Sequence, residues 1–223
     1  MKNHEKRSAI VHAALKLIAV HGFHGAPMSM IADMAGVGTG TIYIYFENKK
    51  ALISAVYRDV ENEMMDAVQP NYPTSLPLRE RFLYLCTVVL KYLIRNPIPC
   101  LFLDQFLSSP YGVNARKRLL GTAGDFDFFR MFFHEGIAGG VLKDLPISMH
   151  FALAFGPVIS LCRDHIMGFV TLTDAMILRV AEACWDAIQE NEAGRVQTVA
   201  VRELSFSQRG KMNAKGKAVS SHR

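Results

Sequence analysis

The side chains best suited to binding chemistry lie close together near the N-terminus, between residues 39 and 49. Thr39, Thr41 and Tyr43 alternate with small or apolar residues, and Lys49 follows them. Hydroxyl and ammonium groups donate hydrogen bonds to phosphate oxygens and to the edges of DNA bases. This spacing favours nucleic-acid binding, provided that a rigid helix presents these groups to a groove wide enough to admit it.

Three helices are predicted to hold these side chains in place. Apolar residues recur at helical spacing over residues 5–21, and two shorter helices are expected over 28–35 and 39–46. Gly36 lies between the short helices, where glycine accepts a positive φ without a Cβ clash. Val37 and Ile42 are placed to fill the space between the helices. The segment is therefore interpreted as a helix-turn-helix.

Residues 35–52, AGVGTGTIYIYFENKKAL, closely resemble the signature of the TetR family of bacterial transcriptional regulators. Ala14, Leu17, Gly22, Phe23 and Ile31 also agree with that family's pattern. The resemblance implies an all-α homodimer, usually a repressor, with a three-helix N-terminal helix-turn-helix domain. Its C-terminal helical domain would bind a small molecule and dimerise through the last two long helices as a four-helix bundle.

The resemblance assigns roles to individual residues. Tyr43 and Lys49 match positions that commonly contact DNA phosphates in the family, and Thr41 matches another frequent contact. Ile42 and Phe46 match core positions. The complete set expected to contact DNA is Ser29, Gly38, Thr39, Gly40, Thr41, Tyr43, Ile44, Tyr45 and Lys49.

Three residues depart from the family pattern. Gly38 and Thr39 stand where Ser and Lys are frequent, and Ile44 stands where a polar residue such as His is common. Thr39 brings no charge that releases counterions from DNA. Ile44 is suited to contact the methyl group of thymine. The alternative is a helical hairpin that merely packs, but a core does not require three glycines and two threonines at this spacing.

The distribution of charge separates three regions. Residues 1–50 carry six Lys and Arg against three Asp and Glu, whereas residues 51–194 carry twelve against sixteen. Residues 195–223 carry seven against one, so the basic balance of the chain comes mostly from this tail. The domains are predicted to be a helix-turn-helix domain (1–48), a helical ligand-binding and dimerisation domain (49–194), and a basic, disordered tail (195–223).

The second domain is predicted to be all-helical, since no alternating strand pattern appears. Helices are expected over residues 49–67, 78–95, 100–107, 114–138, 146–168 and 173–191, with a kink at Pro157. Asn48 and Thr173 are expected to cap the first and last of these helices. The homodimer is assigned to helices 146–168 and 173–191.

Aromatic residues are dense in the second domain, which suggests a pocket for a small, largely apolar effector. The expected lining is Phe82, Cys86, Phe102, Phe106, Phe129, Phe133 and His134. An ordinary filled core is the competing interpretation for any one of these residues.

Several other kinds of site are not expected. His21 with His24, and His150 with His165, lack the third and fourth ligands that a zinc site needs, so no metal and no cofactor are predicted. Four separated cysteines and no secretory signal predict reduced thiols in the cytoplasm. Residues 145–162 carry no formal charge; a helix buried between subunits explains them better than a membrane span.

The sequence thus predicts a DNA-binding regulator, a homodimeric repressor that an apolar effector releases from a double-stranded operator. The first alternative is an all-helical enzyme with its active site in the aromatic cavity, although no nucleophile or acid–base pair has persuasive spacing. The second is an architectural protein that binds DNA mainly through residues 209–223.

Overall fold

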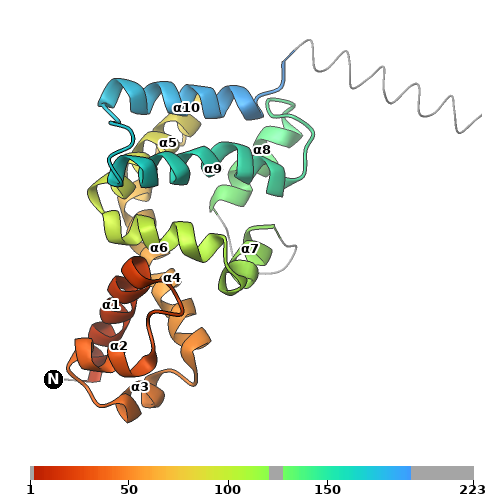
Figure 1. The fold of residues 1–223 in the computed structure, drawn as a ribbon. Helices are drawn as coiled ribbons and strands as arrows, with labels where there is room; N and C mark the ends of the chain where they lie inside the picture. Colours follow the sequence, from red (N-terminus) through yellow and green to blue (C-terminus); the bar gives the residue numbers. More distant parts are fainter. Residues whose placement is uncertain (1–2, 121–127, 192–223) are drawn as a thin grey trace, which may run out of the picture.

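The computed structural model describes residues 3–120 and 128–191, which form helices joined by short turns (Figure 1). The N-terminal helices are α1 (Asn3–His21), α2 (Met28–Ala35), α3 (Thr39–Tyr45) and α4 (Lys49–Val68). They are followed by α5 (Leu78–Arg95), α6 (Pro97–Leu107), α7 (Val113–Leu120), α8 (Phe128–Ala138), α9 (Ile147–Ile166) and α10 (Asp174–Ile188). Two 3₁₀ turns, η1 (Gln69–Asn71) and η2 (Pro110–Gly112), lie between them. The predicted all-α fold is confirmed, with one isolated β-bridge and no strand in the described ranges.

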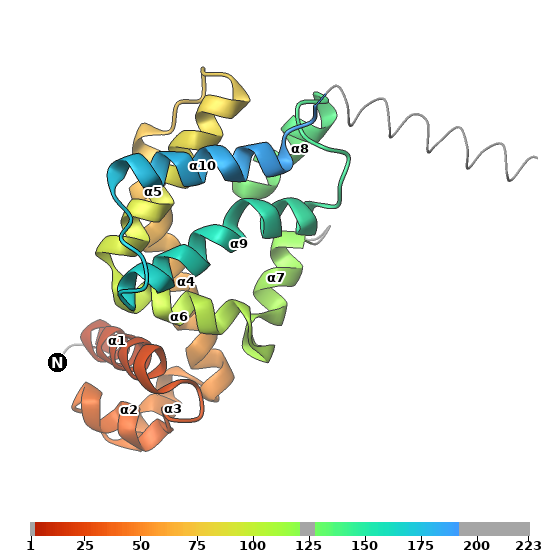
Figure 2. The same cartoon turned by 45° about the horizontal axis from the view of Figure 1, so that its top comes forward.

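Helices α1–α3 form one end of the molecule, and α5, α8, α9 and α10 form the other (Figures 1 and 2). Helix α4 joins the two ends, and α6 packs against both α1 and α9. The buried side chains form one continuous core through both ends. Continuous side-chain packing therefore connects the C-terminal helices to the helix-turn-helix.

Local signals in the sequence set several helix ends. The side chain of Asn48 accepts a hydrogen bond from the Ala51 amide at 2.9 Å, and the Thr173 hydroxyl accepts one from the Met176 amide at 3.3 Å. Both predicted caps are confirmed. Gly22 closes α1 with a φ of 71°, a conformation that glycine adopts without strain.

Several helix boundaries differ from the prediction by one to three residues. The helix expected over residues 114–138 is described as α7 up to Leu120 and as α8 from Phe128, and residues 121–127 lie outside the described part. Helix α6 begins earlier than predicted because Pro97 stands in its first turn, where its missing N–H leaves no hydrogen bond unmade.

No single helix among the described residues is both long and apolar enough to cross a bilayer. Helices α5 and α6 reach that threshold only as a pair, and a bend of 111° separates them.

Candidate nucleic-acid interface and ligand cavity

The turn between α2 and α3 depends on Gly36. Its φ and ψ are 66° and 35°, the left-handed conformation, and its amide donates to the carbonyls of Ala32 and Asp33. The Val37 amide also donates to the Ala32 carbonyl, at 3.0 Å. These bonds satisfy the last carbonyls of α2 and stop the helix sharply. The chain then reverses within three residues and starts α3 at Thr39.

Helix α3 is anchored by the side chains on its inner face. Ile42 is fully buried and Phe46 almost so, in the same core as Ile31 and Ala32 of α2. The guanidinium of Arg7 lies 5.6 Å from the centre of the Phe46 ring. This packing fixes the orientation of the outer face of α3, as a helix that reads DNA requires.

The outer face of α3 is open to solvent and carries no charge. Ile44 is 79% exposed and Tyr43 is 53% exposed. Gly38, Thr39 and Gly40 are exposed beside them, Ser29 is exposed on α2, and Thr41 is half-buried. These are seven of the nine residues expected to contact DNA, and all seven have partly or fully accessible surfaces.

The other two, Tyr45 and Lys49, are engaged within the protein. The hydroxyl of Tyr45 donates to the side chain of Asn3 in α1, so this residue braces the two helices. The ammonium of Lys49 donates to the Phe23 carbonyl at 2.5 Å. Partial burial lowers the pKa of Lys49 from its usual value of 10.5. An ammonium has three donors, so the bond to Phe23 leaves two for other acceptors.

The loop after α1 is held by the C-terminal domain. The Gln105 amide of α6 donates to the Ala19 carbonyl of α1 at 3.0 Å. The ring of Phe23 lies 4.7 Å from that of Tyr111 in η2, centre to centre. Because Phe23 also accepts from Lys49, the short loop after α1 connects η2 to the beginning of α4, and Gln105 connects α6 to the last turn of α1.

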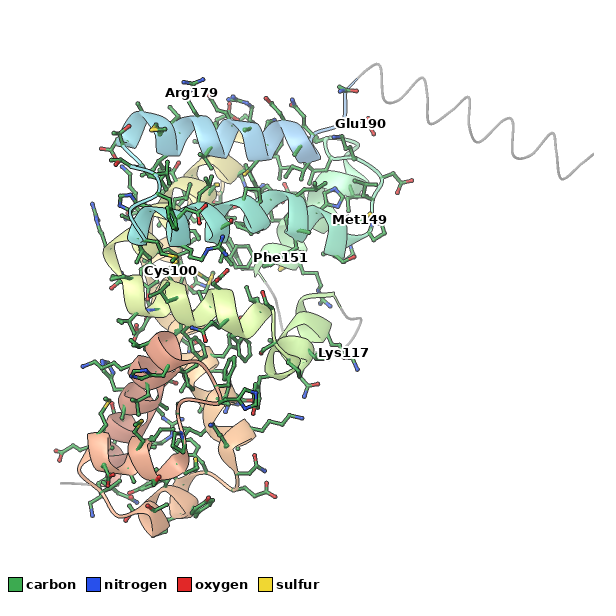
Figure 3. The ribbon with its side chains drawn as sticks, in the orientation of Figure 1. Cys100, Lys117, Met149, Phe151, Arg179 and Glu190 are labelled. Atoms are coloured by element: carbon green, nitrogen blue, oxygen red, sulfur yellow. The ribbon has the colours of Figure 1, made fainter. Side chains whose placement is uncertain are left out.

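A small apolar cavity of about 50 Å³ lies between α4, α5, α6, α8 and α9. It is lined by Tyr57, Glu61, Met64, Val89, Leu93, Leu103, Leu107, Phe129, Phe151, Phe155, Val158 and Ile159. Phe151 lies between α9 and α6 (Figure 3). The only charged residue in this lining, Glu61, accepts a hydrogen bond from the Tyr57 hydroxyl at 2.8 Å. The remaining walls offer dispersion and burial rather than hydrogen bonds, so an apolar group fits them best.

A wider groove of about 280 Å³ adjoins the cavity along α9 and the end of α6. The two share Leu107, Phe151, Phe155 and Ile159 as walls. The groove adds polar groups, namely the side chains of Asp104, Ser108, Ser148 and Ser160. Together they offer an apolar interior with a more polar mouth.

Of the seven residues expected to line a pocket, Phe129 alone borders this cavity among the described residues. Phe82, Cys86, Phe102 and Phe133 are fully buried in the core. Phe106 stacks on Tyr57, with ring centres 4.4 Å apart, and His134 is exposed. An ordinary filled core, the competing interpretation, describes the environment of Phe82, Cys86, Phe102 and Phe133. Phe106 borders a separate hollow of about 100 Å³ between α4, α6, η2 and α7.

The cavity residues outside the predicted set come from α4, α5, α6 and α9. Tyr57 and Met64 are seven residues apart in α4 and so share a helix face. Phe151, Phe155, Val158 and Ile159 belong to the uncharged stretch that was assigned wholly to a subunit interface. One face of that stretch lines the cavity. The sequence does not single out this face, because a helix that is apolar on several sides shows no single apolar stripe.

The cysteines and histidines form no further site among the described residues. All four thiols are free and buried, and they meet as Cys86 with Cys184 and Cys100 with Cys162. These hydrogen bonds and burial raise the pKa of Cys86 and Cys162, which disfavours the reactive thiolate. In residues 3–120 and 128–191 no three His, Cys, Asp or Glu side chains gather around a metal position.

Comparison with known proteins decides the identity of this architecture. The family model described as "Bacterial regulatory proteins, tetR family" matches residues 10–56. A second model, "Tetracyclin repressor-like, C-terminal domain", matches residues 77–189, which is half of the chain. The chain belongs to the TetR family.

The relatives agree with this assignment. An uncharacterized HTH-type transcriptional regulator of Haemophilus influenzae is 26% identical over 181 residues, covering 81% of this chain and 94% of the relative. A solved TetR-family protein of Vibrio parahaemolyticus, a putative transcriptional regulator, is 31% identical with a TM-score of 0.65, covering 83% of this chain and 99% of that one. The Bacillus subtilis regulator FadR in complex with stearoyl-CoA shares the fold, at 19% identity and a TM-score of 0.64, over 81% and 98% of the two chains.

This TetR-family protein is thus a DNA-binding transcriptional regulator. The helix-turn-helix prediction is confirmed, and the alternative of an enzyme finds no support in the relatives. Helices α4 and α6 each line the cavity and each pack against α1 of the DNA-binding end.

Proposed function

We propose that this TetR-family regulator is a homodimeric repressor that an apolar effector releases from its operator in the cytoplasm. The observation that carries the proposal is the position of α4 and α6. Helix α4 begins with Lys49 at the DNA-binding end and contributes Tyr57 to the cavity. Helix α6 contributes Leu103 to the cavity and binds α1 through Gln105.

The size of the cavity supports a coupling between effector and DNA. A volume of about 50 Å³ is far below the ~300–1,000 Å³ of a typical ligand site. An effector whose polar part lies in the adjoining groove of about 280 Å³ and whose apolar part enters the cavity would therefore favour a conformer in which α4 and α6 lie further apart. A ligand that binds the expanded conformer more tightly shifts the population towards it. Movement of α6 then acts on α1 through Gln105 and changes the separation of the two DNA-reading helices.

The effector test uses acyl thioesters as probes, because the related fold of FadR holds stearoyl-CoA. A labelled operator duplex bound to the full chain is titrated with stearoyl-CoA, decanoyl-CoA, decanol and free CoA. We expect release to depend on the apolar chain and free CoA to be inactive. Ile159→Trp, which fills the cavity, should bind DNA but lose the response. Val141→Trp, on an exposed turn, is the matched control.

Three results contradict the effector proposal. One is release by free CoA at the same concentration as by its acyl derivatives. Another is an unchanged response of Ile159→Trp, with thermal melting to establish that this variant is folded. Absence of release by every apolar probe also counts against an apolar effector.

The dimer is proposed to form through α9 and α10. Both helices leave large apolar side chains exposed, namely Met149, Leu153, Met176 and Leu178. Exposed apolar side chains on two neighbouring helices are typical of a subunit interface. Two copies joined this way would carry two α3 helices to half-sites about 34–36 Å apart, one turn of DNA.

Sedimentation velocity tests the dimer. We expect the full chain to sediment as a dimer and the double variant Leu153→Glu with Leu178→Glu to sediment as a monomer. Val20→Glu, at an exposed position of α1, should remain dimeric. A monomeric wild-type chain at micromolar concentration, or a dimeric double variant, would contradict this interface.

A further inference from the structure

The helix-turn-helix lacks the side chains that most often read purines. Residues 28–45, which comprise α2, the turn and α3, contain no Arg, Lys, Asn, Gln or His. Arg and Lys make the common contacts to guanine, and Asn and Gln make the paired contact to adenine. The only charged residue in this segment is Asp33, an acceptor. Sequence discrimination by these elements therefore has to come from hydroxyl groups, apolar contacts and the Asp33 carboxylate, which can accept from cytosine.

The apolar groups on this surface are large and exposed. Among the residues that the structure describes, Ile44 is the most exposed of the large hydrophobic side chains, at 79%, and Met30 and Met34 are about half exposed on α2. Ile44 projects from the opposite side of α3 to Ile42, whose side chain anchors the helix in the core. Exposing a complete isoleucine side chain forgoes the burial that Ile42 achieves on the inner face of α3. Contact with an apolar group of the partner explains its position.

In the major groove, the C5-methyl of thymine is the apolar group that base edges display. Side chains of low polarity contact it without leaving a donor or acceptor unpaired. The glycines at 38 and 40 carry no side chain that would hold α3 away from the base pairs. A Cβ at Gly40 would meet no atom of the protein within 4 Å, so it would project from the surface of α3. The shape and chemistry of this face both match a thymine methyl.

We propose that Ile44 is a specificity-determining residue that selects thymine in each operator half-site by contact with its C5-methyl group. This inference deepens the DNA-binding function and does not depend on the effector or on which helices form the dimer. It concerns base choice, whereas Tyr43 and Lys49 are assigned to the phosphate backbone.

The test begins with selection of duplexes from a randomised 30-base-pair library by the full chain. In the selected duplex each thymine is then replaced, one position at a time, by deoxyuridine. This change removes the methyl group and keeps the base pair. For the wild-type chain we expect one thymine per half-site at which deoxyuridine weakens binding by about 3–5-fold, the value for one buried methyl.

The same duplexes are measured with two variants. For Ile44→Ala, deoxyuridine at that position should change affinity by less than about 1.5-fold, because the methyl has lost its partner. Val20→Ala, at an exposed position of α1 outside the DNA-reading face, should keep the wild-type response. Both substitutions are at exposed sites, and thermal melting establishes that the variants are folded.

Two outcomes overturn the proposal alone: no position at which deoxyuridine weakens wild-type binding, or an equal loss for wild type and Ile44→Ala. Failure to enrich any sequence overturns it together with operator binding by this helix-turn-helix. The effector titration and the sedimentation experiment read out the remaining parts of the proposed function separately.

Discussion

Replacing Gly40 with alanine should strengthen the fold and weaken DNA binding. Gly40 lies in the first turn of α3, with ordinary negative φ, and nothing in the protein lies within 4 Å of the position its Cβ would take. Neither the backbone nor the packing of the chain therefore requires glycine there. We infer that close approach of DNA is what favours glycine at this position.

The expected size of the effect follows from helix propensity. An alanine in place of a helical glycine stabilises a protein by about 0.5–1 kcal/mol. For a chain of this length that corresponds to a rise in Tm of about 1–4 °C. A methyl that holds α3 away from the bases should cost contacts in both half-sites of a dimer, and we expect at least about a tenfold loss of operator affinity, or 1.4 kcal/mol.

Thermal unfolding and fluorescence anisotropy with the selected duplex measure the two effects. Gly36→Ala is the matched control: its Cβ is also free of contacts, but its φ is +66°. That variant should lower stability by about 1–2 kcal/mol because alanine is strained in the left-handed region. If Gly40→Ala raised the Tm and bound the operator as tightly as wild type, DNA would not approach α3 at this residue and our reasoning would be refuted.

Three further predictions concern stability and the tail. Gly136→Ala should destabilise the protein by about 1–3 kcal/mol in urea unfolding, because a Cβ there would lie 2.5 Å from the buried Leu142 side chain. The bidentate bond from Arg81 lowers the pKa of Glu135 below its usual 4.5, so Glu135→Gln should be less stable than wild type at pH 7. That difference should shrink as the pH falls below 4.5, since the carboxylate protonates and its contribution is lost; a difference unchanged at pH 3.5 would contradict it. Deleting residues 195–223 should weaken operator binding and make its salt dependence shallower while keeping sequence preference, whereas loss of all specific binding would favour the architectural role of the tail.

The helix-turn-helix was predictable because its determinants are local. A glycine at the turn, an apolar plug at Ile42 and a cap at Asn48 each act within a few residues of their position in the chain. Their spacing therefore specifies the packing before any long-range contact is known. The engagement of Tyr45 by Asn3 was not predictable in this way, because the two residues are 42 positions apart.

The cavity was harder to predict because apolar periodicity identifies a buried face but not what the face meets. Phe82 and Phe133 belong to that buried surface and pack against other rings. Phe129 also packs against other rings, but it is half-buried and borders the cavity. Which residue borders a gap depends on how five helices pack together, and this information is spread over the whole chain. The pairing of the four cysteines could not be predicted either, because it also depends on how distant helices pack together.

In the proposed dimer, the outer faces of the two α3 helices are expected to bind operator DNA in two successive turns of the major groove. Hydroxyl-radical footprinting of the full chain on the selected duplex tests this central claim most directly, with the double variant Thr41→Ala and Tyr43→Ala beside it. We predict two protected patches whose centres lie about 10–10.5 base pairs apart, and loss of both patches in the variant at equal thermal stability. A single patch, protection without a preferred position, or an unchanged footprint of the variant would contradict the claim.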